Sequence, residues 1–106
     1  RIYNCSGKQG VSFRGLIRAA ALACGQDPER LDLRSFNPAN LDPKARKAFP
    51  LRLNHFLTDI TRVERELAWT PRFDLAQGLA DSYANDYAPN PTADPDFSGD
   101  ATLIGA

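Results

Sequence analysis

The first third of the chain carries hydrophobic side chains at helical spacing. The apolar positions three and four residues apart are Phe13, Leu16, Ile17, Ala20, Ala21 and Cys24. This spacing places all of them on one face of an α-helix. Ser12 stands just before the stretch and is a preferred N-cap residue, while Gly25 follows it where a left-handed residue ends many helices. The pattern therefore predicts a helix over 13–24 whose apolar face is turned toward a core.

The second half of the chain predicts two further helices, which open at capping-box patterns at 61–64 and 74–77. The apolar positions of these helices are Ile60, Val63 and Leu67 in the first and Leu75, Leu79, Tyr83 and, if the helix continues so far, Tyr87 in the second. Trp69 and Pro71 are expected to end the first helix after about two turns, because proline cannot continue a helix.

Three short apolar runs, at 2–5, 31–36 and 55–58, are typical of β-strands. Residues 37–48 contain two prolines and are expected to form a loop. The elements together predict the α/β fold class, with two or three short strands and about three helices.

The end of the chain differs in composition from the rest. From residue 88 on it is rich in Pro, Asp, Ala and Gly and has few apolar residues. We expect this tail to be disordered or to lie over the body of the protein. The expected organisation is one domain over 1–87, followed by an irregular, acidic, Pro/Asp-rich tail over 88–106.

Length and composition limit what this chain forms. Its 106 residues, 42% of them hydrophobic, suffice for one domain with a modest core. No run of eighteen apolar residues is present, so no membrane-spanning helix is predicted. The chain has no Met and opens directly in a predicted strand, so we expect a piece of a longer protein. Cys5 and Cys24 lie on different predicted elements and are expected to be reduced, buried thiols.

The charges cancel in total but are segregated along the chain. Residues 1–72 hold all thirteen Lys and Arg against seven Asp and Glu, a net charge of +6, and residues 73–106 hold six Asp, a net charge of −6. Within 30–52, six basic residues stand against two acidic ones, a net charge of +4. This asymmetry favours an anion-binding face, and the alternative is a solvated face partly neutralised by the acidic tail.

Side chains suited to catalysis are scarce. The single histidine, His55, cannot form a multi-histidine metal site, and Tyr83 and Tyr87 lack a Lys four residues later. We expect no catalytic, metal-binding or cofactor-binding residue in this chain. The Gly7-Lys8-Gln9-Gly10 segment lies between a predicted strand and a predicted helix, but it lacks the spacing of a dinucleotide or phosphate loop. An ordinary turn is therefore the preferred interpretation over a phosphate-binding loop.

The stretch 47–56 alternates cations and aromatic residues around a proline. Arginine and lysine are suited to phosphate, and neighbouring aromatic rings are suited to stacking on a base. The alternative is that Phe49, Leu53 and Phe56 anchor a core while the charges face water, and the two interpretations are compatible. The candidate residues for binding a phosphate-containing ligand are Arg46, Lys47, Arg52 and His55.

Several motifs occur in an order that is informative as a set. They are Tyr3-Asn4, the helix from Ser12, the loop with Arg52, the segment 59–66, Leu67-Ala68-Trp69-Thr70-Pro71 and Asp74-Leu75-x-x-Gly78-Leu79. This order resembles the carboxyl-terminal part of the extended short-chain dehydrogenases/reductases (SDR), the NAD-dependent epimerase/dehydratase family of nucleotide-sugar enzymes. Ala68 stands where that family commonly has glycine.

A closer likeness rests on the segments 48–56, 69–75, 81–83 and 93–97, which read AFPLRxxHF, WxPxFDL, DSY and ADPDF. They resemble the chloroplast stem-loop-binding proteins and their cyanobacterial relatives, a divergent branch of the same family. The family resemblance implies a Rossmann domain upstream that would hold NAD(P), with this chain as the substrate-binding C-terminal domain and Arg52 near a nucleotide diphosphate. The branch implies RNA binding and cleavage, in a cyanobacterial cytoplasm or the chloroplast stroma.

These observations leave three hypotheses open. In the first, the chain is the ligand-binding part of an epimerase/dehydratase-like protein that closes over a nucleotide-sugar or RNA, and it does not catalyse alone because the cofactor domain is missing. In the second, it belongs to an RNA-binding module on an SDR scaffold without redox activity. In the third, its apolar surface packs against the missing Rossmann domain or a second copy in a homo-oligomer. No membrane partner is expected.

Overall fold

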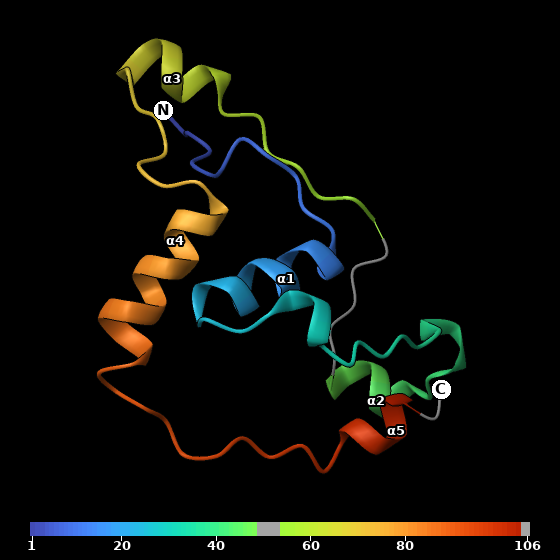
Figure 1. Ribbon diagram of the computed structural model, residues 1–106. Helices are drawn as coiled ribbons and strands as arrows, with labels where there is room; N and C mark the ends of the chain where they lie inside the picture. The colour runs from blue at the N-terminus through green and yellow to red at the C-terminus, as the bar shows by residue number, and fades with distance from the viewer. Residues whose placement is uncertain (49–53, 105–106) are drawn as a thin grey trace. The chain divides into compact units, whose positions relative to one another are not determined.

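The computed structural model describes residues 1–48 and 54–104. Its α-helices are α1 (Phe13–Ala23), α2 (Pro43–Ala48), α3 (Thr61–Leu67), α4 (Leu75–Ser82) and α5 (Asp100–Ile104) (Figure 1). Short 3-10 turns lie at Pro28–Arg30 and Pro38–Asn40, and a π-helical turn at Tyr83–Tyr87 directly follows α4. Across these described ranges, no helix is long and apolar enough to cross a membrane.

The expected α/β fold class is wrong, because the described part of the chain contains helices and no β-strand. The runs at 2–5, 31–36 and 55–58 lack regular secondary structure instead. A strand needs a hydrogen-bonded neighbour, and runs this short bury too little surface to hold one another in a sheet. Ile2 illustrates the point, since its side chain is 86% exposed.

The loop expected over 37–48 is also wrong in part. Its two prolines start helical turns rather than prevent them: Pro38 opens a 3-10 turn and Pro43 opens α2. Proline is well tolerated at the first helical position, because the N–H that it lacks has no partner within the helix there. The segment therefore presents its cations from a helix instead of from an irregular loop.

The residues group into two compact units. Unit 1 comprises 1–31 and 56–91 and contains α1, α3 and α4. Within it, α1 packs against α4, and the 3-10 turn at Pro28–Arg30 packs against α1. The buried apolar side chains of this unit are Ala21, Ile60 and Val63.

Unit 2 comprises 32–55 and 92–106, so residues of the tail join the basic middle of the chain. It contains α2 and α5. Leu41 is buried and Phe36 is half-buried, and they contribute to the core of this unit. The expected division into a domain over 1–87 and a tail over 88–106 stays a prediction.

Three predicted helix ends are confirmed. Ser12 Oγ accepts a hydrogen bond from the Gly15 amide at 3.0 Å, and Gly25 has a φ of 77°. Asp74 and Gln77 form the predicted capping box, in which Asp74 Oδ1 accepts from the Gln77 amide at 2.8 Å and Gln77 Oε1 accepts from the Asp74 amide at 3.0 Å. These contacts satisfy amides that have no partner within the helix.

The capping box predicted at Thr61 and Glu64 is wrong. Helix α3 begins at Thr61, and Asp59 takes the capping role, with Oδ1 accepting from the Thr61 amide at 2.9 Å and from Thr61 Oγ1 at 2.6 Å. These hydrogen bonds, that from the hydroxyl first, hold the pKa of Asp59 below its usual value. Helix α3 ends at Leu67 and is followed by Ala68, whose φ of 52° is left-handed, so it ends just before Trp69.

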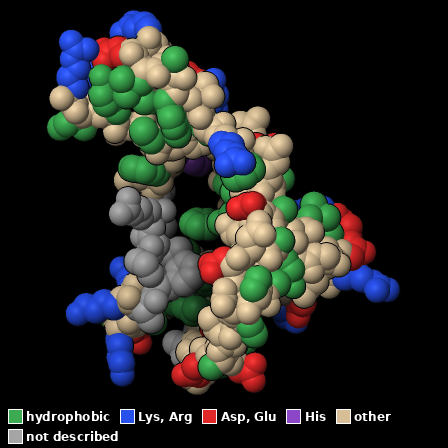
Figure 2. Space-filling view, turned by 90° about the vertical axis from the view of Figure 1, so that its left-hand side faces the viewer, with side chains coloured by type: hydrophobic (Ala, Val, Ile, Leu, Met, Phe, Trp, Pro, Cys, Tyr) green, Lys and Arg blue, Asp and Glu red, His purple; other side chains and the backbone are tan. Residues whose placement is uncertain are grey.

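Much apolar surface lies open in both units (Figure 2). On α1 the predicted face is not turned fully to a core, since Phe13 is 66% exposed whereas Ala21 is buried. Helices this few and this short cover only part of one another. The prediction that this surface packs against another domain stays a prediction.

Candidate functional site

The candidate ligand-binding residues of unit 2 are Arg46 and Lys47 on α2 and Arg52 and His55 later in the segment 32–55. Asp42 starts α2 by accepting a hydrogen bond from the Ala45 amide at its Oδ1, at 2.7 Å. Pro43 follows at the first position, and the remaining residues of the helix, Lys-Ala-Arg-Lys-Ala, all have high helix propensity. Local sequence therefore accounts for this short helix.

Lys44 and Lys47 share one face of α2, because residues three apart lie about 60° from each other around a helix axis. Both side chains are exposed, and neither forms an ion pair within the described residues. Arg46 also is exposed, and its Nη2 donates to the Ala39 carbonyl at 3.3 Å. Arg46 thus ties α2 to the preceding 3-10 turn, while the two lysines are open to a ligand.

Arg34 is a cation of this unit that is already engaged. Its Nη2 lies 2.7 Å from Asp32 Oδ2. The guanidinium lowers the pKa of Asp32 through this hydrogen bond, and the carboxylate raises the pKa of Arg34. This pairing removes Arg34 from the cations that are available to an external anion.

The predicted site residues are only partly placed by the structure. Arg46 and Lys47 lie on α2, and His55 is an exposed residue of the same compact unit. Arg52 lies outside the described residues, as does half of the stretch 47–56 that carried the prediction. The role of all four in ligand binding stays a prediction.

Sequence reasoning did not select Lys44. It stands three residues before Lys47, and this spacing indicates a shared helix face. A spacing of three places two side chains on one face only in a helix. Because residues 37–48 were expected to form a loop, the spacing of Lys44 and Lys47 did not indicate a shared face. With α2 in place, Lys44 and Lys47 form the exposed, unpaired cationic pair of the described part of unit 2.

The glycine-containing segment 7–10 behaves as an ordinary connection. Lys8 Nζ forms an ion pair with Glu64 of α3, so this cation is already neutralised. A Cβ built at Gly10 would lie 2.8 Å from Leu57 Cδ2, the end of an exposed side chain that can move aside, so packing does not require glycine there. The Lys8–Glu64 ion pair favours the predicted turn over a phosphate-binding loop.

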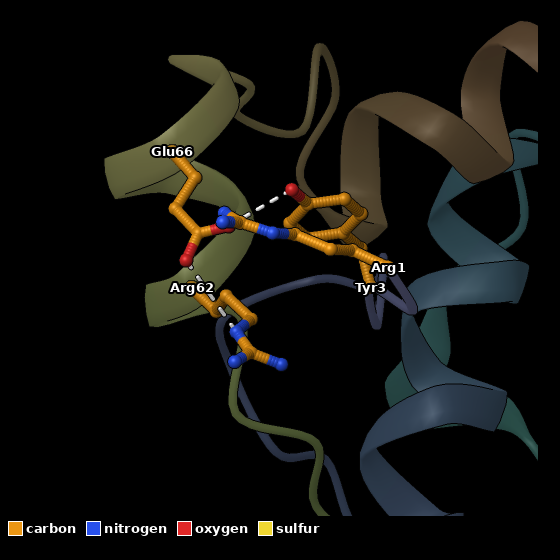
Figure 3. Close-up of polar contacts among 4 residues, drawn as sticks. All are labelled: Arg1, Tyr3, Arg62 and Glu66. Carbon is orange, nitrogen blue, oxygen red and sulfur yellow. Dashed lines mark hydrogen bonds and ion pairs between the residues drawn. The ribbon is translucent and has the colours of Figure 1, made fainter.

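A polar cluster joins the start of the chain to α3 (Figure 3). Glu66 Oε2 accepts from the Tyr3 hydroxyl at 2.8 Å and from Arg1 Nη1 at 3.0 Å, and Glu66 Oε1 lies 3.6 Å from Arg62 Nε. The hydrogen bond to Glu66 raises the pKa of Tyr3, because it stabilises the protonated phenol. A phenol held as a donor does not act as a base, so this cluster is a structural tie.

Other reactive groups do not assemble into a site. The described residues contain no group of three or more His, Cys, Asp and Glu arranged to hold a metal ion. Cys5 is exposed and Cys24 is half-buried, with its Sγ donating to the Ala21 carbonyl at 3.3 Å. The expectation that both thiols are buried is therefore wrong, since Cys5 is exposed and Cys24 only half-buried.

Comparison with known proteins adds one relative. The chain is 41% identical over 87 residues to the chloroplast stem-loop binding protein of 41 kDa b, chloroplastic, from Arabidopsis thaliana. The matched residues are 81% of this chain and 22% of the relative, so the chain spans about a fifth of the relative's length. No protein-family model and no solved structure matches the chain.

The relative supports the resemblance to the stem-loop-binding branch. The resemblance to the carboxyl-terminal part of the epimerase/dehydratase family stays a prediction, because the comparisons contain no member under that name. NAD(P) and a Rossmann domain upstream, both implied by that resemblance, likewise stay predictions.

Proposed function

We propose that this chain is part of an RNA-binding protein and that it contributes phosphate contacts to a stem-loop. The observation that carries the proposal is the similarity to a protein named for stem-loop binding, which extends over 81% of this chain. A match of this length, at 41% identity, includes residues of both compact units. From the chloroplastic relative we infer a chloroplast location. The stroma or a cyanobacterial cytoplasm, implied by the resemblance to the stem-loop-binding branch, stays a prediction.

The charge distribution of unit 2 supports the same function. Phosphate contacts supply most of the affinity in sequence-independent binding to nucleic acids, and they come chiefly from lysine and arginine. Lys44 and Lys47 extend from one face of α2 without an ion-pair partner in the part of the chain that the structure describes. We assign them, with Arg46, Arg52 and His55, to the phosphate backbone of the RNA.

The arrangement predicts shape and charge recognition rather than base reading. Lysine is a point charge on a flexible stem and does not discriminate between bases when it contacts phosphate. A six-residue helix with two lysines on one face spans roughly two phosphates of one strand. These contacts would supply only part of the affinity for a stem-loop.

A salt titration with matched charge variants tests the proposal. The probe is an RNA hairpin of about 20 nucleotides, and the variants are Lys44→Gln/Lys47→Gln and the control Arg14→Gln/Arg65→Gln. Each pair removes two exposed cations that lack an ion pair within the described residues, from unit 2 and unit 1 respectively. We expect the lysine variant to lose about tenfold in affinity near 0.1 M salt and its log–log salt slope to shrink by about 1.5.

The outcomes separate the proposed function from its alternatives. Equal losses in the lysine variant and the control would mean that net charge alone matters, and the assignment to α2 would be wrong. A nucleotide-sugar that raises the melting temperature, with a shallow salt dependence and no hairpin binding, would instead support the epimerase/dehydratase hypothesis. In that case Arg52→Ala is expected to abolish the rise.

A further inference from the structure

The acidic tail and the basic helix α2 belong to the same compact unit. Unit 2 joins 32–55 to 92–106, although more than thirty residues of unit 1 separate them in the sequence. Leu103 of α5 is half-buried within the described chain, and α5 belongs to this unit. The tail is therefore part of the same compact unit as the segment to which the phosphate contacts are assigned.

The two segments carry opposite and equal charge. Residues 32–55 contain five Lys and Arg against two Asp, a net charge of +3, and residues 92–106 contain three Asp and no basic residue, a net charge of −3. The tail aspartates are Asp94, Asp96 and Asp100. Unit 2 is thus neutral as a whole, although each of its two segments is strongly charged.

The distances between charges within unit 2 are comparable to the length over which salt screens them. A compact body of about forty residues has a radius of gyration of about 9 Å. The screening length is about 10 Å at 0.1 M salt, so charges in both segments interact across the unit. The tail therefore lowers the positive potential that α2 presents to an incoming anion.

The opposite charges are nevertheless not locked together. Within the described residues, the ion pair of unit 2 is Arg34–Asp32, and Asp94, Asp96 and Asp100 form none. Asp96 accepts from the Ser98 amide at 2.9 Å, a contact within the tail itself. A screening segment without fixed ion pairs can be displaced by a stronger polyanion, whereas a buried salt bridge resists displacement.

We propose that the acidic tail is an intramolecular competitor of RNA, which occupies the field of α2 in the free protein and is displaced when phosphates bind. This inference rests on the proposed function and adds its regulation. As a consequence, binding requires a minimum number of phosphates in the ligand. A short anion with few charges does not displace the tail, whereas a folded RNA with many adjacent phosphates does. Binding is then selective for high local phosphate density without any contact to bases.

The test neutralises tail charges and compares the result with a matched control in unit 1. Asp94→Asn/Asp100→Asn removes two tail charges and leaves the Asp96–Ser98 contact intact. Asp81→Asn/Asp86→Asn changes the net charge equally, on α4 and the π-helical turn of unit 1. We expect the tail variant of the 106-residue chain to bind an RNA hairpin about three- to tenfold more tightly near 0.05 M salt, and the gain to vanish near 0.5 M.

A second measurement, made without RNA, detects the electrostatic interaction between the tail and α2. In the free protein, the tail variant is expected to shift the backbone amide NMR signals of Lys44 and Lys47 at low salt, and the control is not. Hairpin binding that is equal in wild type and tail variant, with unchanged lysine signals, would overturn the inference and leave the proposed function standing. Equal gains in both variants would overturn it too. Absence of hairpin binding in every variant would instead overturn the proposed function.

Discussion

The carboxylate of Asp59 makes the stability of the start of α3 depend on pH. It accepts from the amide and hydroxyl of Thr61, and its pKa is lowered in the folded chain. A lowered pKa means that the stabilising contribution is present above the ordinary carboxyl value of about 3.9 and is lost as pH falls through the folded value. Asp59→Asn is therefore expected to be less stable than wild type at neutral pH and to lose less stability on acidification.

Urea unfolding between about pH 7 and pH 2.5 measures this difference. Asp86→Asn is the control, since the Asp86 side chain makes no capping contact in the described chain. A stability profile of Asp59→Asn that runs parallel to wild type down to the lowest pH would contradict the assignment. The same logic applies to Asp32 and Asp96, whose pKa values are lowered by Arg34 and by Ser98.

Single residues of the candidate site were only partly predictable. Positive charge and its clustering can be read from the sequence, which is how Arg46 and Lys47 were selected. Which cations already have a partner cannot be read there, because Lys8–Glu64 joins residues far apart in the chain. Lys44 was missed for a different reason, since its role depends on the helix that contains it.

At the scale of elements, an Asx–Pro pair starts a helical turn at three places. Asp27, Asn37 and Asp42 each accept a hydrogen bond from an amide two or three residues later, at 2.9, 3.0 and 2.7 Å. A proline follows each of them at the first helical position. The side chain caps the turn, and the proline fixes φ without losing a needed N–H. The dipeptide by itself is not sufficient, because no helical turn follows Asn90–Pro91 or Asp94–Pro95. At the three places above, the capping hydrogen bond accompanies the helical turn.

Two substitutions at Asp42 separate its cap from its charge. Asp42→Asn and Asp42→Ala both remove one negative charge, but only the amide side chain can still accept from the Ala45 amide. We expect Asp42→Ala to lose about 1 kcal/mol of helix stability relative to Asp42→Asn, seen as reduced Cα secondary shifts over 43–48. Hairpin affinity is expected to be lower in Asp42→Ala than in Asp42→Asn. Equal affinities would show that the order of α2 does not matter for binding.

Helices were predicted better than strands because their signals are local. The cap at Ser12, the left-handed Gly25 and the box at 74–77 each depend on residues within one turn. The runs at 2–5 and 31–36 have apolar composition, but a sheet also requires a partner strand elsewhere in the chain. Composition cannot show whether that partner exists, and this is where the α/β prediction failed.

At the scale of the whole molecule, few of the hydrophobic residues that the structure describes are fully buried. Val63 is 2% exposed and Phe13 is 66% exposed, although both belong to apolar faces of predicted helices. Truncating a buried valine removes two methyl groups from the core, whereas truncating an exposed ring removes little buried area. We expect Val63→Ala to cost about 2 kcal/mol of unfolding free energy and Phe13→Ala less than about 0.5 kcal/mol.

Urea unfolding of both variants at several protein concentrations tests whether this surface is free in solution. If Phe13→Ala costs as much as Val63→Ala and the cost grows with protein concentration, the ring is covered by a second copy, as the hypothesis of a structural or oligomeric role requires. If its cost stays small at every concentration, the surface of α1 is free in the isolated chain. Replacement of its exposed apolar residues by polar ones is then expected to raise solubility without loss of the fold.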